Sequence, residues 1–166
     1  FCERIKMDLA NAFCNLFNRT VSMINKYFDG IIPEYKGNVT EFDSSLSGLA
    51  KAVISKYESD MDDLKITDAY IAVDELVTRA NKYIDETTPW ALAKDESKKD
   101  ELASVMNHLA NAIYTAAILY SPTLVKASSK ALDQLGVPEE LRDYKNIYNF
   151  GVLGGQKVNK GDALFP

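Results

Sequence analysis

One tryptophan stands where its ring could meet a flat partner. Trp90 is the only tryptophan in the chain and directly follows Pro89. Thr88 can act as an N-cap, and Pro89 suits the first helical position because its missing N–H and fixed φ cost nothing there. Trp90 then falls in the first turn, where a ring is less easily enclosed than in mid-helix and can stack on an unpaired base. The alternative is that Trp90 closes the end of a hydrophobic core.

Polar side chains form a stripe along the first predicted helix. They are Asp8, Asn15, Arg19, Ser22 and Lys26, at steps of three, four or seven residues. Asn15 and Arg19 point the same way, and their amide and guanidinium groups are suited to hydrogen bonding with base edges. A solvated helix face is the usual explanation of such a stripe. The stacking aromatic expected at Trp90 favours contact with nucleic acid.

Residue types for catalysis or metal binding are scarce. His108 is the only histidine and has no glutamate three residues before it, so the inward-facing Glu-x-x-His pairs of di-iron bundles are absent. A Ser-His-Asp device would also depend on His108, which we expect to be a surface or hydrogen-bonded core histidine. The GVLGG segment at 151–155 lacks the lysine of a phosphate loop, and we expect flexible chain there. These residues predict no catalytic or metal centre.

Size and composition predict a single domain. The chain has 166 residues, of which 46% are hydrophobic and 26% charged, as in soluble globular proteins. No apolar run approaches the roughly 18 residues of a membrane span, so we expect no membrane partner. The net charge of −5 argues against binding DNA or RNA by general neutralisation of phosphate. Any contact with RNA must be local and geometric.

The ends and cysteines predict a cytoplasmic fragment. The N-terminal sequence FCERIKMDLANAF already has helical periodicity and resembles no signal peptide, so we expect a piece of a longer chain. Cys2 and Cys14 lie twelve positions apart on one predicted helix, about 18 Å, and cannot pair. Two free thiols are typical of a cytoplasmic protein.

Apolar spacing predicts an all-α fold, an antiparallel bundle of about five helices. The bundle covers about 1–144, and an irregular, glycine-rich tail covers 145–166. The predicted helices are 3–28, 41–59, 66–84, a short one at 88–94, 100–120, and a further one ending near 135.

Two long motifs carry a family resemblance. RIKMDLANAFCNLFNRTVSMINKYFDG at 4–30 and NKYIDETTPWALAKD at 81–95 resemble the anticodon-binding domain of bacterial methionyl-tRNA synthetase. The similarity extends over nearly the whole chain. It implies that residues 1–166 form one anticodon-binding domain that recognises the CAU anticodon of methionine tRNA. The alternative is a structural or protein-interaction bundle that does not bind RNA.

The resemblance also implies roles for particular residues. Asn15 and Arg19 match the family's anticodon-contacting pair, Trp90 matches the tryptophan on which the first anticodon base stacks, and Pro89 matches the proline before it. Ala12, Phe13 and Cys14 replace the Asp-Leu-Gly common in relatives, which puts the local packing in question. The family's catalytic domain, with its HIGH and KMSKS signatures, is absent. The resemblance implies a parent ligase that uses ATP and Mg, while this domain itself holds no cofactor.

Two acidic residues precede Trp90. We expect Asp85, with Glu86, to repel the backbones of wrongly shaped anticodon loops and so to contribute to specificity. The alternative is that both carboxylates only cap or solvate neighbouring helix ends.

Overall fold

The computed structural model describes residues 2–122, 124–148 and 150–158, with side chains from residue 11 onward. Within these ranges the chain is helical, without a strand. The elements are α1 (Cys2–Phe28), α2 (Asp43–Asp62), α3 (Ile66–Thr87), α4 (Pro89–Leu92), the 3₁₀ turn η1 (Glu96–Lys98), α5 (Lys99–Tyr120), α6 (Val125–Gln134) and the 3₁₀ turns η2 (Glu139–Leu141) and η3 (Tyr144–Tyr148). The predicted all-α class and bundle are confirmed, and the predicted helix ends differ by only a few residues.

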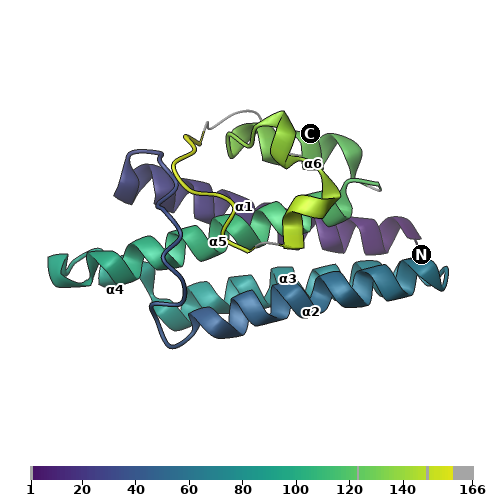
Figure 1. Ribbon diagram of the computed structural model, residues 1–166, viewed down its shortest axis with the longest axis horizontal. Helices are drawn as coiled ribbons and strands as arrows, with labels where there is room; N and C mark the ends of the chain where they lie inside the picture. Colours follow the sequence, from purple (N-terminus) through teal and green to yellow (C-terminus); the bar gives the residue numbers. More distant parts are fainter. Residues whose placement is uncertain (1, 123, 149, 159–166) are drawn as a thin grey trace.

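The long helices lie alongside one another in alternating directions. In Figure 1, α1 and α3 run toward the end of the molecule that carries α4, while α2 and α5 run the opposite way. Helix α5 lies at the centre and packs against α1, α2, α3 and α6. All residues of α5 from 104 to 120 are buried. This helix is therefore the scaffold on which the others are held.

The apolar length of α5 corrects one sequence argument. Of the described helices, the segment Glu96–Tyr120 is long and apolar enough to cross a membrane, contrary to the expectation that no such run exists. However, 94% of the most apolar stretch of this segment is buried inside the protein, as is typical of a core helix.

The turn between α3 and α4 differs from the predicted N-cap. Thr88 has a left-handed backbone with φ of 44°, and its side chain makes no capping hydrogen bond. An N-cap hydroxyl reaches the first-turn N–H groups from an extended backbone, which Thr88 does not have. Instead its carbonyl accepts hydrogen bonds from the backbone N–H groups of Ala91 and Leu92, at 2.9 and 3.2 Å. Pro89 occupies the start of α4, as predicted.

The C-terminal segment is held against the bundle. Residues 155–158 run antiparallel to 30–32, with backbone hydrogen bonds of 2.7–2.8 Å. Leu153 is fully buried, and the side chains of Asn107 and Asn111 bond to its carbonyl and N–H. The flexible chain expected at 151–155 is therefore an ordered, irregular segment. Residues 159–166 lie outside the described ranges.

Candidate nucleic-acid interface

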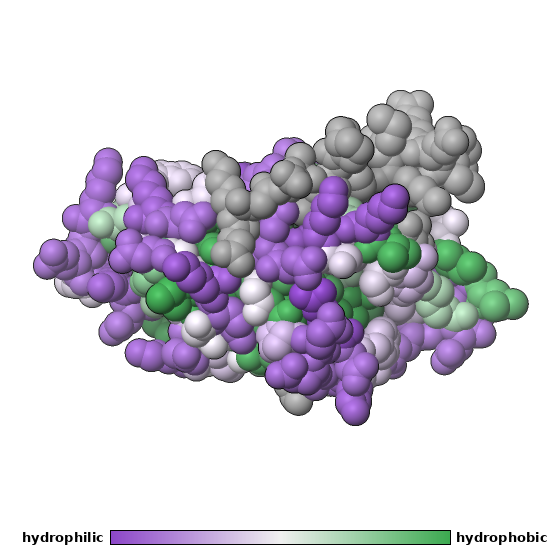
Figure 2. Space-filling model, turned by 90° about the horizontal axis from the view of Figure 1, so that it is seen from above, coloured by the Kyte–Doolittle hydropathy of each residue, from purple (hydrophilic) through white to green (hydrophobic). Residues whose placement is uncertain are grey.

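Trp90 is accessible in the first turn of α4. Its side chain is 46% exposed, while Pro89 before it is buried. Pro89 thus anchors the short helix, and the indole is left partly open to solvent. The interpretation that Trp90 fills the end of the core does not fit this exposure, because fully enclosed rings in this protein, such as Tyr83, have no exposed surface. The view of Figure 2 shows that the end of the molecule carrying α4 is mostly hydrophilic.

Arg19 of α1 is fixed against the last turns of α3. Its Nη2 donates to Asp85 Oδ1 at 3.1 Å, and its Nη1 donates to Asn81 Oδ1 at 3.3 Å. The side chains of Arg19 and Asp85 are 40% and 69% exposed. Asn15 lies one turn earlier on α1 and is exposed. The guanidinium therefore faces solvent in a defined orientation, beside the segment that leads into α4.

The same contact changes the description of the acidic pair. Asp85, expected as a repelling carboxylate, forms an ion pair with Arg19, and Glu86 pairs with Arg79 at 2.6 Å. Neither carboxylate is simply a helix cap. Sequence analysis missed Asn81, although it lies four residues before Asp85 and so shares its helix face.

The departure at 12–14 is accommodated by packing. Phe13 is fully buried, and its ring meets that of Tyr120 edge to face with centroids 5.5 Å apart. Ala12 and Cys14 pack partly buried against the same core. Burial raises the pKa of the Cys14 thiol to about 11, so it is protonated at neutral pH. Residues 12–14 of α1, just before Asn15, are therefore packed against the core despite their departure from the family pattern.

A buried polar cluster joins the segment before α2 to α3 and α5. Asp43 accepts hydrogen bonds from the hydroxyls of Tyr83 and Ser104 and from the backbone N–H groups of Val39 and Thr40. Burial alone would raise the pKa of Asp43, but the hydrogen bonds from Ser104, Thr40 and Tyr83 outweigh it and lower the pKa below its ordinary value. The cluster holds a charged carboxylate inside the fold.

His108 belongs to this cluster and is a hydrogen-bonded core histidine, as predicted. Its Nδ1 lies 2.8 Å from the Ser104 carbonyl, and its Nε2 lies 3.2 Å from the Asn38 amide. Burial lowers the pKa of His108, against the opposing effect of Asp43, so the ring is neutral at neutral pH. It is fully enclosed and cannot reach a substrate. Among the described residues, no group of three or more acidic, histidine or cysteine side chains could hold a metal ion.

Known proteins similar to this chain agree on one family. The family model described as "Anticodon binding domain of methionyl tRNA ligase" matches residues 32–165. The chain is 50% identical to methionine–tRNA ligase of Bacillus subtilis and 49% identical to that of Listeria monocytogenes, over its whole length. It covers 25% and 26% of those proteins, about a quarter of their length.

A solved structure shares the fold. The apo form of Mycobacterium tuberculosis methionyl-tRNA synthetase superposes with a TM-score of 0.88 at 27% identity, covering 98% of this chain and 33% of that protein. Relatives of the same kind thus appear by sequence and by structure. Because the family model matches most of the chain, the chain belongs to the family of anticodon-binding domains of methionyl-tRNA ligase.

Proposed function

We propose that this chain selects methionine tRNA by binding the CAU anticodon, as one part of a longer cytoplasmic ligase. The catalytic domain of that ligase joins methionine to the tRNA with ATP and Mg. The observation that carries the proposal is a partly exposed tryptophan on α4, close in the chain to the Asp85 that orients Arg19. A stacking surface and a hydrogen-bonding fork are the two elements that recognition of an unpaired base requires.

Each site residue has a distinct role in this proposal. Trp90 stacks on the first anticodon base, and Pro89 fixes the start of the helix that presents the indole. Arg19 and Asn15 donate hydrogen bonds to base edges. Asp85 weakens the binding of loops that do not satisfy Arg19. In the free protein Asn81 and Asp85 hold the guanidinium of Arg19 beside the segment that leads into α4, so a loop must offer hydrogen bonds that replace the Asp85 contact.

The overall charge is consistent with this division of roles. A chain with a net charge of −5 gains little from general attraction to phosphate. Stacking on an aromatic is worth roughly 1–3 kcal/mol per base, and a bidentate base contact roughly 1–3 kcal/mol of discrimination. Affinity and specificity would then come from a few local contacts.

The test is a titration with RNA stem-loops that carry either the CAU anticodon or an altered one. Trp90→Ala is expected to weaken CAU binding by about one to two orders of magnitude. Tyr148→Ala removes an aromatic of similar exposure, 48%, from another part of the chain and should leave binding unchanged. Arg19→Lys keeps the charge but loses the planar fork, so it should reduce discrimination more than affinity.

If both loops bind with equal affinity, and Trp90→Ala and Arg19→Lys change neither, the domain is a structural or protein-interaction bundle.

A further inference from the structure

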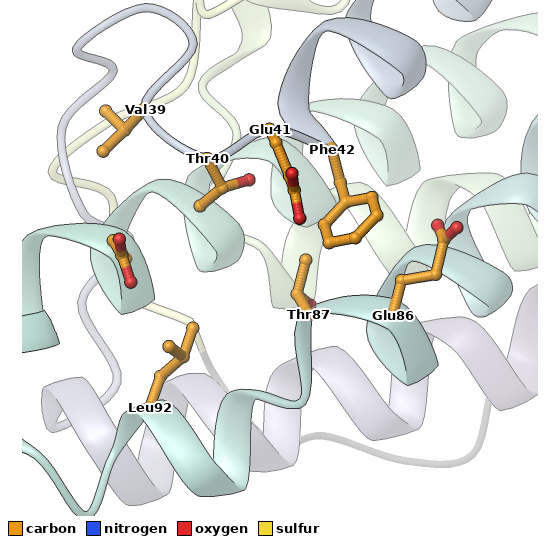
Figure 3. A pocket seen from close by; sticks show the side chains of 8 residues that line it. Val39, Thr40, Glu41, Phe42, Glu86, Thr87 and Leu92 are labelled. Atoms are coloured by element: carbon orange, nitrogen blue, oxygen red, sulfur yellow. The ribbon is translucent and has the colours of Figure 1, made fainter.

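Two surface hollows lie beside α4, and Leu92 lines both. The first, of about 300 Å³, is shown in Figure 3, where Phe42 and Thr87 face Leu92 across the opening. The second, of about 280 Å³, lies between the end of α1 and the η1–α5 segment. An RNA strand leaving the indole of Trp90 can continue over one hollow or the other. Charge distinguishes the two paths.

The first hollow repels phosphate. Three glutamates line it, Glu41, Glu86 and Glu101, and among the residues that the structure describes no lysine or arginine does. Glu86 is paired with Arg79 at 2.6 Å, which offsets part of that charge. Two carboxylates still give this side of α4 a negative potential, so a polyanion is disfavoured there.

The second hollow has a balanced charge and a partly apolar floor. Lys26 and Lys99 offset Asp95 and Glu96, and the aromatic rings of Tyr27 and Phe28 lie among its lining residues. The Lys26 ammonium lies 5.5 Å from the centroid of the Tyr27 ring, close enough for a cation–π contact that keeps it near that ring.

One of the two acidic residues of this hollow, Asp95, is engaged by the protein, while the other, Glu96, is the first residue of η1. Asp95 accepts hydrogen bonds from the backbone N–H of Ser97 at 3.0 Å and from its hydroxyl at 2.6 Å. These bonds tie its carboxylate to the start of η1 and hold the pKa of Asp95 below its ordinary value. Asp95 thus stays charged but fixed in place, and Lys26 and Lys99 are the cationic lining residues that a phosphate could contact.

The second hollow is also continuous with the proposed anticodon site. Lys26 follows Arg19 by seven residues, two turns along the same polar stripe of α1, or about 10 Å. Ala93, which lines this hollow, follows Trp90 by three residues and so lies one turn away from it.

We propose that the second hollow binds the nucleotide next to the one stacked on Trp90, with its base against the Tyr27 side and its phosphate contacting Lys26 and Lys99. This inference rests on the proposed function. At about 280 Å³ the hollow is slightly smaller than the roughly 300–1,000 Å³ of drug-sized ligand pockets, which suits a single nucleotide. The anticodon loop therefore passes α4 on the α1 side and avoids the glutamate-lined hollow.

The experiment measures binding of the CAU stem-loop as a function of salt for single-site variants of this chain. Each phosphate contact in a single strand contributes a slope of about 0.7 in log affinity against log salt, or about fivefold at 0.1 M salt. Lys26→Ala and Lys99→Ala are each expected to weaken binding about fivefold, and the double variant about 25-fold, with a shallower salt slope. Lys65→Ala is the matched control, because this exposed lysine lies at the α2–α3 turn, away from α4.

Glu41→Gln tests the opposite path. If the RNA crosses the second hollow, this variant should bind with nearly unchanged affinity. If Glu41→Gln instead tightens binding while Lys26→Ala and Lys99→Ala match the Lys65→Ala control, the loop passes on the other side and the inference is wrong. If Trp90→Ala also has no effect, the proposed function itself fails, so the two failures are distinguishable.

Discussion

Replacing Asp85 by Asn separates two roles for the Arg19–Asp85 pair. If Asp85 competes with RNA for Arg19 and repels phosphate, the variant should tighten binding of an anticodon-altered stem-loop more than of the CAU loop. A correct loop replaces the Asp85 contact with hydrogen bonds of its own, whereas a wrong loop cannot. Neutralising Asp85 therefore helps the wrong loop most.

The exposure of the Arg19–Asp85 ion pair sets the expected size of the Asp85→Asn effect. With side chains 40% and 69% exposed, the ion pair falls in the surface class, whose coupling is typically about 0.2–1 kcal/mol. That corresponds to a loss of discrimination of about 1.4- to 5-fold. The free energy of unfolding should change by less than about 1 kcal/mol. The difference between the two loops should shrink as salt rises, because exposed charges are screened over about 10 Å at 0.1 M.

The assay is a pair of titrations, with CAU and altered loops, in wild-type and Arg19→Ala backgrounds. An effect of Asp85→Asn that disappears without Arg19 acts through the guanidinium, and one that persists is direct repulsion of RNA. Glu86→Gln, which neutralises the neighbouring carboxylate paired with Arg79, is the matched control. Weaker binding of the CAU loop alone would refute the reasoning, since it would make Asp85 a residue that only positions Arg19.

Two further predictions concern stability. Asp43→Asn should lower the free energy of unfolding by about 2–4 kcal/mol at neutral pH, because it replaces charge-assisted hydrogen bonds in a buried site with neutral ones. The pKa of Asp43 is lowered on folding, so its contribution is present above the ordinary aspartate pKa of about 3.9 and is lost as pH falls through the lower folded-state value. Urea unfolding from pH 7 to pH 3 checks this, and a gap between wild type and variant that does not shrink in acid would contradict it. Thr88→Gly should raise stability by about 0.5–1 kcal/mol, a Tm increase of about 2–4 °C per kcal/mol, because the steric strain that glycine relieves in the left-handed backbone exceeds the entropy that glycine adds to the unfolded chain, and no capping bond is lost. Calorimetry measures that shift, and an unchanged or lower Tm would show that Thr88 is not strained.

Much of this protein follows from local sequence. Apolar residues at steps of three and four fix the helices because a helix that buries one face needs that period, and the long predicted segments appear within a few residues of their expected ends. The accessibility of Trp90 also follows locally, since Pro89 begins a helix and leaves the next residue in its first turn. The spacing of Asn15 and Arg19 on one helix face is a property of α1 alone.

Contacts between segments distant in the sequence could be identified only from the tertiary structure. Arg19 and Asp85 are 66 residues apart, and only the packing of α1 along α3 makes them an ion pair. The conformation of Thr88 is decided by how α3 ends and α4 begins, which overrides its capping preference. The order of residues 153–158 depends on pairing with 30–32 and on two buried asparagines of α5. Local periodicity carries no information on such partners, because the free energy of each contact arises only when helices specified separately are packed together.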